Sequence, residues 1–445
     1  MSEPSPAGLK LISTRWTMIA LTVLGVTMLA LYRVAVQSKG VVDIAWFLKL
    51  VVVQSALYLG VAWLSLRSRT SRRVLVVGLL FAALFRLSII FYPPYLSDDI
   101  YRYVWDGRVQ STGVNPYRYI PADESLANLR DEKIYPNMNR RDSAQTIYPP
   151  VAEAAFLLIT RFSESVTWMK AAMVAFEAIA IWAIVQLLIS FGFAPQRVLI
   201  YAWHPLVVWE FAGSGHVDAL AIAFIALALL ARRKDGEILT GVLLACATCV
   251  KLFPAVLFPA LYKRASWKMP LAFVATVVVA YLPYLGVGPL GVLGSLPGYA
   301  SERGLFSGDQ FFLLTVARQF VNAHLPTSAY LVFVIAVLGV LSLWLMQDRR
   351  GNYLRNGLII ASIFMLLLAP HFSWYFCWLI VFLCFIPSLA GFYLSLASFL
   401  LYLTWLNDTP DRVMILKALM FVPFLMLGIF ELWRHRKLMV RLPHE

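Results

Sequence analysis

The sequence predicts an all-α, polytopic transmembrane protein. Of its 445 residues, 60% are hydrophobic and 14% are charged, whereas ordinary globular domains carry about 25% charged residues. The apolar residues fall into many runs close to the roughly 20 residues that a transmembrane helix needs, and we expect about 12–14 spans. These observations exclude a soluble enzyme, a secreted disulfide scaffold and a disordered chain.

The basic residues form short clusters between the apolar runs. The formal net charge of +14 would raise the question of nucleic acid in a soluble domain. Clusters in this position are typical of cytoplasmic loops, so we expect the lipid bilayer as a partner and no nucleic acid. The strongest marker of the cytoplasmic side is four arginines within seven residues: Arg67, Arg69, Arg72 and Arg73.

The alternation of apolar runs and polar loops divides the chain. The divisions expected, in order, are 1–92 (N-terminal transmembrane helices), 93–147 (an extracytoplasmic loop with an acidic motif), 148–287 (a central transmembrane module), 288–310 (a second extracytoplasmic loop) and 311–445 (C-terminal transmembrane helices and a cytoplasmic tail). The first loop is expected to contain short helices of its own.

The central module allows two topologies. It joins an outer loop to the basic cluster that begins at Lys263, so the number of crossings is odd. The apolar segments available are 148–162, 166–190, 198–212, 216–231 and 238–262. Five full crossings place the basic run 232–234 outside, against the charge rule. Alternatively, 198–231 is one span broken at Gly213–Gly215, and 238–262 is a re-entrant hairpin with Lys251 at its tip.

The acidic residues are concentrated in the loop 93–147, which holds eight of the chain's 24. A proline pair ends the preceding span, and the Ser-Asp pair that follows can cap a new helix. On that helix Asp99, Tyr103 and Asp106 are spaced i, i+4 and i+7 and share a face, with Asp98 and Arg102 beside them. One interpretation is a capped interfacial helix with a solvated face; the other is a site for sugars, which aromatic, Arg and Asp side chains suit.

Five short stretches carry a family resemblance. They are Asp98-Asp99, Gly113-Val-Asn115-Pro116-Tyr117, Tyr148-Pro149-Pro150, Lys251-Leu-Phe-Pro254 and Pro370-His371-Phe-Ser-Trp374-Tyr375. In type and order they resemble the GT-C class of integral membrane glycosyltransferases, which use polyprenyl-phosphate-linked sugars, and within it the mannosyltransferase-like branches. The acidic motif here is Ser-Asp-Asp and not Asp-x-Asp, and matching back from the Pro-Tyr turn puts Asp99 on the second acid.

The resemblance implies an inverting sugar transfer on the extracytoplasmic face. The donor expected is a polyprenyl-phosphate sugar, with mannose favoured, and the acceptor is a hydroxyl of a glycolipid or cell-envelope glycan. An acceptor hydroxyl needs a general base, for which we expect Asp99, with Asp98 as the alternative. The leaving phosphate needs facing cations, and the candidates are Arg303, Lys251, His371, Arg102 and Arg108. The candidates for substrate binding are Tyr103, Asp106, Tyr117, Tyr148, Trp374 and Tyr375.

Two questions stay open at the level of sequence. His204, Glu210, His216 and Asp218 could suggest a metal site or a proton relay, since intramembrane ionisable groups are often functional. Their spacing fits no compact metal motif, and we interpret the stretch as a structural break. No cofactor is certain, and a divalent cation near the paired aspartates is possible. The rival class is a lipid or sugar transporter or flippase, which often shows inverted repeats; none is visible here.

Overall fold

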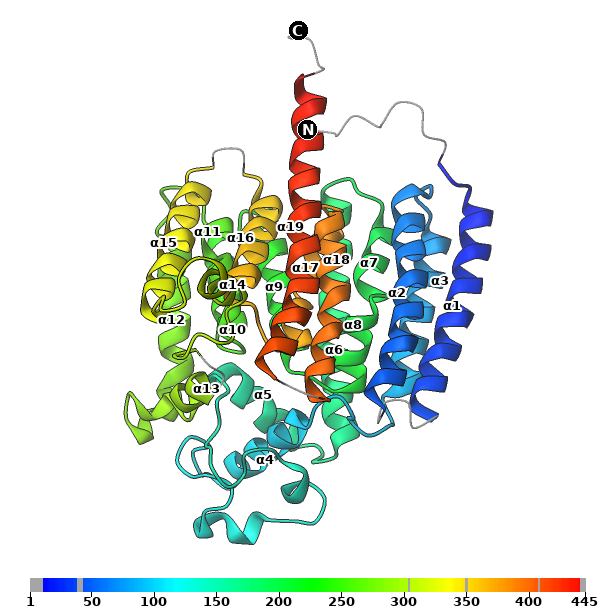
Figure 1. Cartoon of the computed structure of the whole chain (residues 1–445). Helices are drawn as coiled ribbons and strands as arrows, with labels where there is room; N and C mark the ends of the chain where they lie inside the picture. The colour runs from blue at the N-terminus through cyan, green and yellow to red at the C-terminus, as the bar shows by residue number, and fades with distance from the viewer. Residues whose placement is uncertain (1–10, 38–42, 303–304, 349–350, 407–408, 441–445) are drawn as a thin grey trace.

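The computed structural model describes residues 11–37, 43–302, 305–348, 351–406 and 409–440. Over these residues the regular secondary structure is helical, apart from one isolated bridge between Ile12 and Ser68. The longer helices run side by side as a bundle, and the loop 93–147 covers one end of it (Figure 1). We call this the loop end. The all-α polytopic prediction is confirmed.

The first three helices form one edge of the bundle. They are α1 (Thr14–Gln37), α2 (Ile44–Arg67) and α3 (Arg72–Ile89). The first two have 24 residues each, about 36 Å at 1.5 Å per residue, which exceeds the roughly 30 Å of bilayer hydrocarbon. Asp43 caps α2 by accepting hydrogen bonds from the backbone N–H groups of Ala45 and Trp46. All three helices lie within 1–92, the segment expected to hold the N-terminal transmembrane helices.

The loop that follows builds a small layer of short helices. It contains α4 (Asp99–Ser111) and the 3₁₀ turns η1 (Glu124–Leu129) and η2 (Tyr135–Asn137), and it leads into α5 (Pro150–Thr160). With 11 residues, α5 is about 16 Å long, too short to cross a bilayer. It packs against α4 at the loop end (Figure 1). The segment 148–162 is therefore not a crossing by itself, because its chain turns back at Arg161 before α6.

The central module is a long helix followed by two folded-back pairs. Its elements are α6 (Val166–Ser190), η3 (Pro195–Val198), α7 (Leu199–Ala202), α8 (Pro205–Val208), the π-helical turn η4 (Trp209–Gly213), α9 (Asp218–Arg233), α10 (Glu237–Thr248), η5 (Phe253–Leu257) and α11 (Phe258–Leu261). The chain reverses at 214–217 and again at 249–252. Both reversals lie toward the loop end, next to α4 and the pocket described below.

Several basic side chains of this module lie at the opposite end of the bundle. Arg233 donates to the carbonyl of Ser190, Arg232 donates to that of Leu261, and Lys263 lies 3.4 Å from Asp235. We call this the basic end. The arrangement combines parts of both predicted topologies: 198–231 is a folded-back pair, as the first alternative has it, whereas the hairpin with Lys251 at its tip agrees with the second. Because the chain folds back twice, the basic run 232–234 lies at the same end of the bundle as Lys263.

The remaining helices complete the bundle. They are α12 (Lys268–Tyr281), η6 (Leu282–Val287), η7 (Gly291–Leu293), α13 (Leu296–Glu302), α14 (Phe312–Phe320), α15 (Thr327–Met346), α16 (Tyr353–Leu368), η8 (Ser373–Phe376), α17 (Leu379–Leu383), α18 (Leu389–Ala397), η9 (Ser398–Trp405) and α19 (Pro410–Val440). Six helices in the described residues are long and apolar enough to cross a membrane, with shorter apolar helices between them. The span count of 12–14 stays a prediction.

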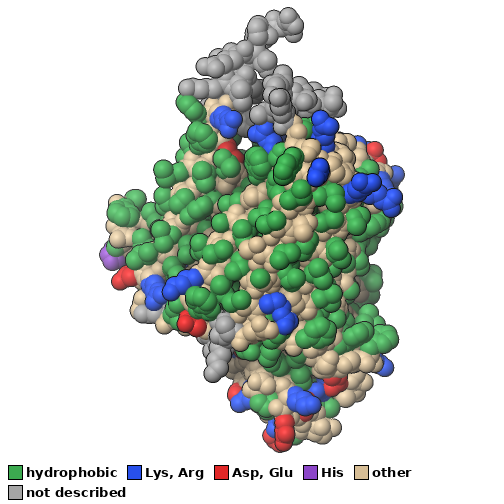
Figure 2. All heavy atoms as spheres, turned by 90° about the vertical axis from the view of Figure 1, so that its right-hand side faces the viewer, with side chains coloured by type: hydrophobic (Ala, Val, Ile, Leu, Met, Phe, Trp, Pro, Cys, Tyr) green, Lys and Arg blue, Asp and Glu red, His purple; other side chains and the backbone are tan. Residues whose placement is uncertain are grey.

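The outer surface carries the chemistry of a membrane protein. Figure 2 shows hydrophobic side chains over the middle of one face, with Lys and Arg gathered toward the basic end. Large apolar side chains such as Trp63, Val52 and Ile335 are more than half exposed. A soluble monomer rarely presents so continuous an apolar face, so the bilayer is the surrounding that this surface fits.

A buried ion pair ties the N-terminal helices to the central module. Arg86 of α3 and Glu177 of α6 are bonded through two N–H groups of the guanidinium, one at 2.7 Å, and neither side chain is more than 5% exposed. Arg86 also donates to the carbonyl of Ala202, 3.0 Å away. Charged groups inside a membrane bundle persist only when they are compensated in this way.

Removing one partner of this pair should destabilise the bundle. We expect Arg86→Met or Glu177→Met alone to lower the unfolding free energy by about 3–5 kcal/mol, because each leaves an uncompensated buried charge. The double variant should recover most of that loss. Thermal unfolding in detergent checks both. Single variants as stable as the unmodified protein would contradict this account of the pair.

Candidate active site

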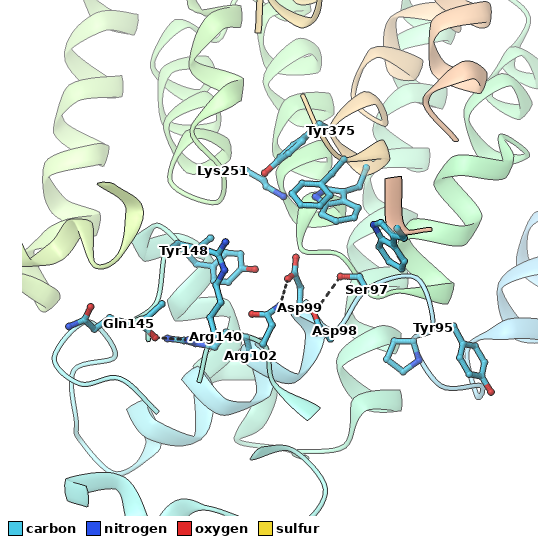
Figure 3. A pocket seen from close by; sticks show the side chains of 17 residues that line it. Tyr95, Ser97, Asp98, Asp99, Arg102, Arg140, Gln145, Tyr148, Lys251 and Tyr375 are labelled. Atoms are coloured by element: carbon cyan, nitrogen blue, oxygen red, sulfur yellow. Dashed lines mark hydrogen bonds between the residues drawn. The ribbon is translucent and has the colours of Figure 1, made fainter. Parts of the chain in front are cut away.

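The paired aspartates lie where the loop helix begins. Asp98 is the residue before α4 and Asp99 is its first residue, and the backbone N–H of Asp99 donates to the hydroxyl of Ser97 at 3.2 Å. The side-chain amide of Asn139 donates to both carboxylates, at 2.6 Å to Asp98 and 3.0 Å to Asp99 (Figure 3). Asn139 therefore fixes the two acids relative to each other.

These acids open into a pocket of about 490 Å³ at the loop end of the bundle. The wall is built from the start of α4, the loop segment 139–148, the turn at Lys251, the segment 372–375 and Trp405. The sequence-predicted residues that line it are Asp98, Asp99, Arg102, Tyr148, Lys251, Trp374 and Tyr375. Segments separated by more than 270 positions are thus brought to one cavity.

Lys251 is a fixed positive charge in this wall. Its ammonium lies 2.6 Å from Asp218 and 4.6 Å from the centre of the Tyr375 ring. Both members of the ion pair are largely buried, so the attraction is screened less than at a surface. The ring adds a cation–π contact, and Lys251 is held in place at the pocket edge.

Burial raises the pKa of the Asp99 carboxyl above the ordinary range. Desolvation is the main cause, because it disfavours the charged form. The positive charge of Lys251 and the hydrogen bond from Asn139 act in the opposite direction, while Asp98 and Asp218 raise the pKa further. Asp99 is therefore a carboxylate with an unusually strong tendency to hold a proton, which is the property of a general base.

A second group of sequence-predicted residues supports the wall from behind. Tyr103 stacks on Phe156 at a centroid distance of 4.5 Å, and Tyr117 donates its hydroxyl to the carbonyl of Tyr148 at 2.6 Å. Asp106 is buried and paired with Arg102 at 2.8 Å. Asp99, Tyr103 and Asp106 share one face of α4, as predicted. Only the first turn of α4 reaches the pocket, because the rest of this face packs on α5 and on the loop segment 144–148.

The other phosphate candidates lie elsewhere. Arg108 pairs with Asp131 and Glu164, each at 2.9 Å, and its guanidinium holds the pKa of Asp131 down to about 2 in spite of partial burial. His371 is not among the residues that line the cavity. Arg303 lies outside the described residues. Among the five predicted cations, the pocket therefore brings together Lys251 and Arg102.

Several pocket residues were missed in the sequence. Asn139, Arg140 and Gln145 come from an irregular polar stretch without periodicity, where only the fold shows which side chains turn inward. Arg140 has a left-handed backbone (φ 51°), unusual for a residue with a side chain, and it lies beside Tyr148 in Figure 3. Trp405 reaches the cavity from the end of η9.

The four ionisable residues of the central module lie in two separate places. His216 and Asp218 lie behind the pocket, where the chain reverses after η4, and Glu210 lies 3.4 Å from the His216 ring. His204 is elsewhere, with its ring tilted against Tyr58 at a centroid distance of 4.5 Å and bonded to Ser395. The structural break is present, and it also places three of the four ionisable side chains near Asp99.

Metal-ligating side chains do not converge in the part of the chain that the structure describes. No group of three or more His, Cys, Asp or Glu residues there is arranged to hold an ion. The amide nitrogen of Asn139 occupies the space between the two aspartates as a donor. A donor in that position competes with a cation for the two carboxylates.

The fold and the site define a polytopic all-α membrane protein with an acidic, aromatic-walled pocket at one end of its bundle. Residues 13–265 match the family described as alpha-(1->6)-mannopyranosyltransferase, N-terminal domain. This is more than half of the chain, and the protein belongs to this family. The matched region includes Asp98, Asp99, Asn139 and Lys251, and it ends before the aromatic segment 372–375.

A curated relative extends the similarity. Over 336 residues the chain is 24% identical to alpha-(1->6)-mannopyranosyltransferase A of Mycobacterium tuberculosis (strain ATCC 25618 / H37Rv). The aligned part covers 64% of this chain and 60% of the relative. The chain thus spans about three fifths of the length of the curated protein that it matches.

The reversal at 214–217 depends on Gly215, which predicts a specific stability defect. Its φ is +76°, and a Cβ there would collide with Cδ1 of Ile100 and lie 3.1 Å from Cγ of Lys170. We expect Gly215→Ala to cost roughly 2–4 kcal/mol, from backbone strain plus overpacking.

Gly113→Ala is the matched control for this variant. Gly113 also has a positive φ, of +84°, but a Cβ there would meet no neighbour within 4 Å. Gly113→Ala should therefore lower the free energy of unfolding only through backbone strain, by about 1 kcal/mol. Thermal unfolding of both variants in detergent checks the difference. Equal losses would show that the reversal does not pack tightly on α4.

Proposed function

We propose that the protein is an inverting mannosyltransferase of the extracytoplasmic face. It moves mannose from a polyprenyl-phosphate donor to a hydroxyl of a lipid-linked or cell-envelope glycan. The observation that carries the proposal is the pocket itself, in which Asp99 faces a buried cation, Lys251, across a cavity walled by Tyr148, Trp374 and Tyr375. The family to which the chain belongs supports the choice of mannose.

Asp99 is the general base in this proposal. The acceptor hydroxyl loses its proton as its oxygen attacks the anomeric carbon, and a carboxylate within hydrogen-bond reach can take that proton. Burial gives Asp99 a raised pKa, which favours proton uptake. Direct attack from the side opposite the phosphate inverts the anomeric configuration. Asp98, tied to the same amide of Asn139, orients the pair and the acceptor.

The cations of the wall stabilise the leaving group. A departing polyprenyl phosphate gains negative charge, and preorganised positive groups in a partly dry pocket lower the barrier to its departure. Lys251 is held by Asp218 and Tyr375, and Arg140 and Arg102 line the same cavity. Arg102 is bonded to Asp106 and to the carbonyl of Ala144. Lys251 and Arg140 are the proposed phosphate ligands, because both line the cavity.

The aromatic side chains provide surfaces for sugar rings. Phe372 and Trp374 are stacked at a centroid distance of 4.3 Å, nearly parallel, and Tyr148 and Trp405 stand on other sides of the cavity. Aromatic faces pack well against the apolar faces of sugars. About 490 Å³ is enough for more than one hexose ring, as transfer between a donor sugar and an acceptor sugar requires.

The sidedness of the proposal follows from charge. The pocket lies at the loop end, whereas Arg232, Arg233 and Lys263 lie at the basic end. Basic residues of short loops mark the cytoplasm, so the pocket faces the other side of the membrane. A polyprenyl-phosphate donor anchored in the outer leaflet would reach it from the bilayer.

Asp99→Asn is the direct test of the base. Purified protein in nanodiscs is incubated with radiolabelled polyprenyl-phosphate mannose and a membrane-lipid glycan fraction, and label in the acceptor is counted. We expect Asp99→Asn to lower the transfer rate roughly 100- to 10,000-fold, because an amide cannot accept the proton. Asp98→Asn removes a charge at the neighbouring position, and its transfer rate should fall less than tenfold.

The alternatives make this test decisive. Full activity of Asp99→Asn would remove its assignment as base, and a larger loss in Asp98→Asn would move that role to Asp98. Protein-dependent movement of the labelled lipid across the bilayer, without transfer to any acceptor, would favour a transporter or flippase.

Asn139→Ala should shift the pH dependence of transfer. The amide of Asn139 stabilises the ionised form of Asp99 and so lowers its pKa. Its removal raises the pKa, so activity that needs ionised Asp99 is lost at a higher pH as the pH falls. We expect the acidic limb of the kcat/KM profile to move upward while the rate on the alkaline side is retained.

Asn137→Ala is the matched control in the same loop. The side chain of Asn137 donates to the carbonyl of Lys133 and contacts neither aspartate. Its pH profile should match that of the unmodified protein. An acidic limb that stays in place in Asn139→Ala would contradict the role assigned to that hydrogen bond.

A further inference from the structure

A buried histidine stands directly behind the proposed base. Nδ1 of His216 lies 3.9 Å from Oδ2 of Asp99, and its Nε2 lies 3.4 Å from Oε2 of Glu210. The side chain of His216 is 1% exposed. The imidazole thus stands between two carboxylates, one on the pocket and one deeper in the bundle.

The ring is fixed in orientation but its nitrogens are unsatisfied. His216 stacks on Trp374 at a centroid distance of 4.0 Å, with 24° between the ring planes. Neither ring nitrogen has a hydrogen-bond partner, and Oε2 of Glu210 has none either. Buried polar atoms in native proteins are nearly always paired, so three such atoms in one row indicate hydrogen bonds that form in another protonation state or in the substrate complex.

The row continues beyond the histidine. The other oxygen of Glu210 is bonded to the hydroxyl of Tyr402, 2.5 Å away. On the pocket side, Asn139 holds Oδ1 of Asp99, so Oδ2 is the oxygen that faces the imidazole. Asp99, His216, Glu210 and Tyr402 therefore form a line that runs from the pocket into the bundle, and hydrogen bonds from Asn139 and Tyr402 hold the two carboxylates on the sides away from His216.

The charges around the imidazole set its role. The titratable groups that surround it from the neighbouring elements are Asp99 (α4), Glu210 (η4), Asp218 (α9), Lys251 (the turn after α10), Cys377 (after η8) and Tyr402 (η9). Burial and the positive charge of Lys251 lower the pKa of the His216 ring, and Asp218 lies 2.6 Å from that ammonium. Asp99 and Glu210 flank the ring, and an imidazolium formed there during the reaction would lie between these two acids.

We propose that His216 is a positioning residue for Asp99 that takes over the proton lost by the acceptor, with Glu210 as its buried counter-ion. This inference rests on the proposed function. Catalytic hydrogen bonds are often long in a substrate-free site and shorten in the complex. A small rotation of the Asp99 carboxylate about its bond to Asn139 would bring Oδ2 within hydrogen-bond distance of Nδ1.

In the transfer step, every bond that breaks is matched by a bond that forms or by a charged leaving group. The acceptor O–H bond breaks as its oxygen forms the new bond to the anomeric carbon, and the bond from that carbon to the phosphate oxygen breaks with its electron pair leaving on the polyprenyl phosphate. The proton goes to Asp99 and on to Nδ1 of His216, leaving an imidazolium between two carboxylates. It returns through Asp99 to water when the products leave.

His216→Gln tests the relay, and His204→Gln is its matched control. Both histidines are fully buried in the broken middle, but His204 bonds to Ser395 and to the backbone N–H of Leu206, away from the pocket. Glutamine can still bridge two carboxylates but cannot take up a proton. The readouts are kcat, KM and the pH profile of mannose transfer, with membrane yield and thermal stability measured in parallel.

The relay predicts a kcat effect with a pH signature. We expect His216→Gln to lower kcat at least tenfold with KM within twofold. Its acidic limb should move up by about one pH unit, because Asp99 loses a neighbour that can carry positive charge. His204→Gln should keep the pH profile of the unmodified protein whatever it costs in stability. A His216→Gln variant with kcat within threefold and an unshifted limb would overturn the relay.

Two further variants keep the outcome unambiguous. If His216→Gln is not recovered as folded protein, Glu210→Gln tests the inner end of the row, where a fall in kcat of at least fivefold at constant KM supports the relay and an unchanged kcat overturns it. Asp99→Asn run alongside separates the two proposals. If the unmodified protein transfers mannose, Asp99→Asn does not and His216→Gln does so normally, only the relay is refuted. If the unmodified protein transfers no mannose, the proposed function is refuted.

Discussion

The site depends on one close approach between backbone segments. The reversal at 214–217 packs against the first turn of α4 with room for no side chain at Gly215, whose neighbours are Ile100 and Lys170. This contact brings the loop helix onto the bundle and sets Asp99 beside His216. Lys170 holds the same corner from the other side by donating to the carbonyl of Tyr92 at 2.6 Å. Without this contact the paired aspartates would sit on a loop with no cavity behind them.

Compensation of buried charge then decides which groups are available for chemistry. Arg86 is bound to Glu177, Arg102 to Asp106 and Lys251 to Asp218. The first and third pairs connect elements that are distant in the sequence, and the second lies within α4. A buried charge without a partner is costly, so the pairs are structural requirements as well as electrostatic features. Asp99 is different, because its hydrogen bond from a neutral amide leaves its negative charge facing the cavity. A preorganised field of this kind is the main means by which polar sites lower reaction barriers.

Part of this arrangement could be predicted from the sequence. The acidic pair at a helix start, the turn at Lys251 and the aromatic stretch at Trp374 are local patterns, and the pocket contains all three. The topology of the middle was harder, because apolar periodicity does not reveal that α5 is too short to cross, or whether 198–231 is one broken span or two segments that fold back at 214–217. Asn139, Arg140 and Trp405 could not be found, since nothing local says which side chains of an irregular loop turn inward. His216 was visible as an intramembrane histidine, but its distance to Asp99 is set by the close approach at Gly215, which only the fold shows.

The central claim is that one cavity holds the acceptor hydroxyl at Asp99 and the donor phosphate at Lys251. The most direct test is an electron cryo-microscopy structure of the Asp99→Asn protein in nanodiscs with polyprenyl-phosphate mannose and a glycan acceptor. The account predicts an acceptor oxygen about 3 Å from the side chain at position 99 and the phosphate within about 3–4 Å of the Lys251 ammonium. Donor density at the basic end, or at mid-bundle away from residues 98, 99 and 251, would contradict it.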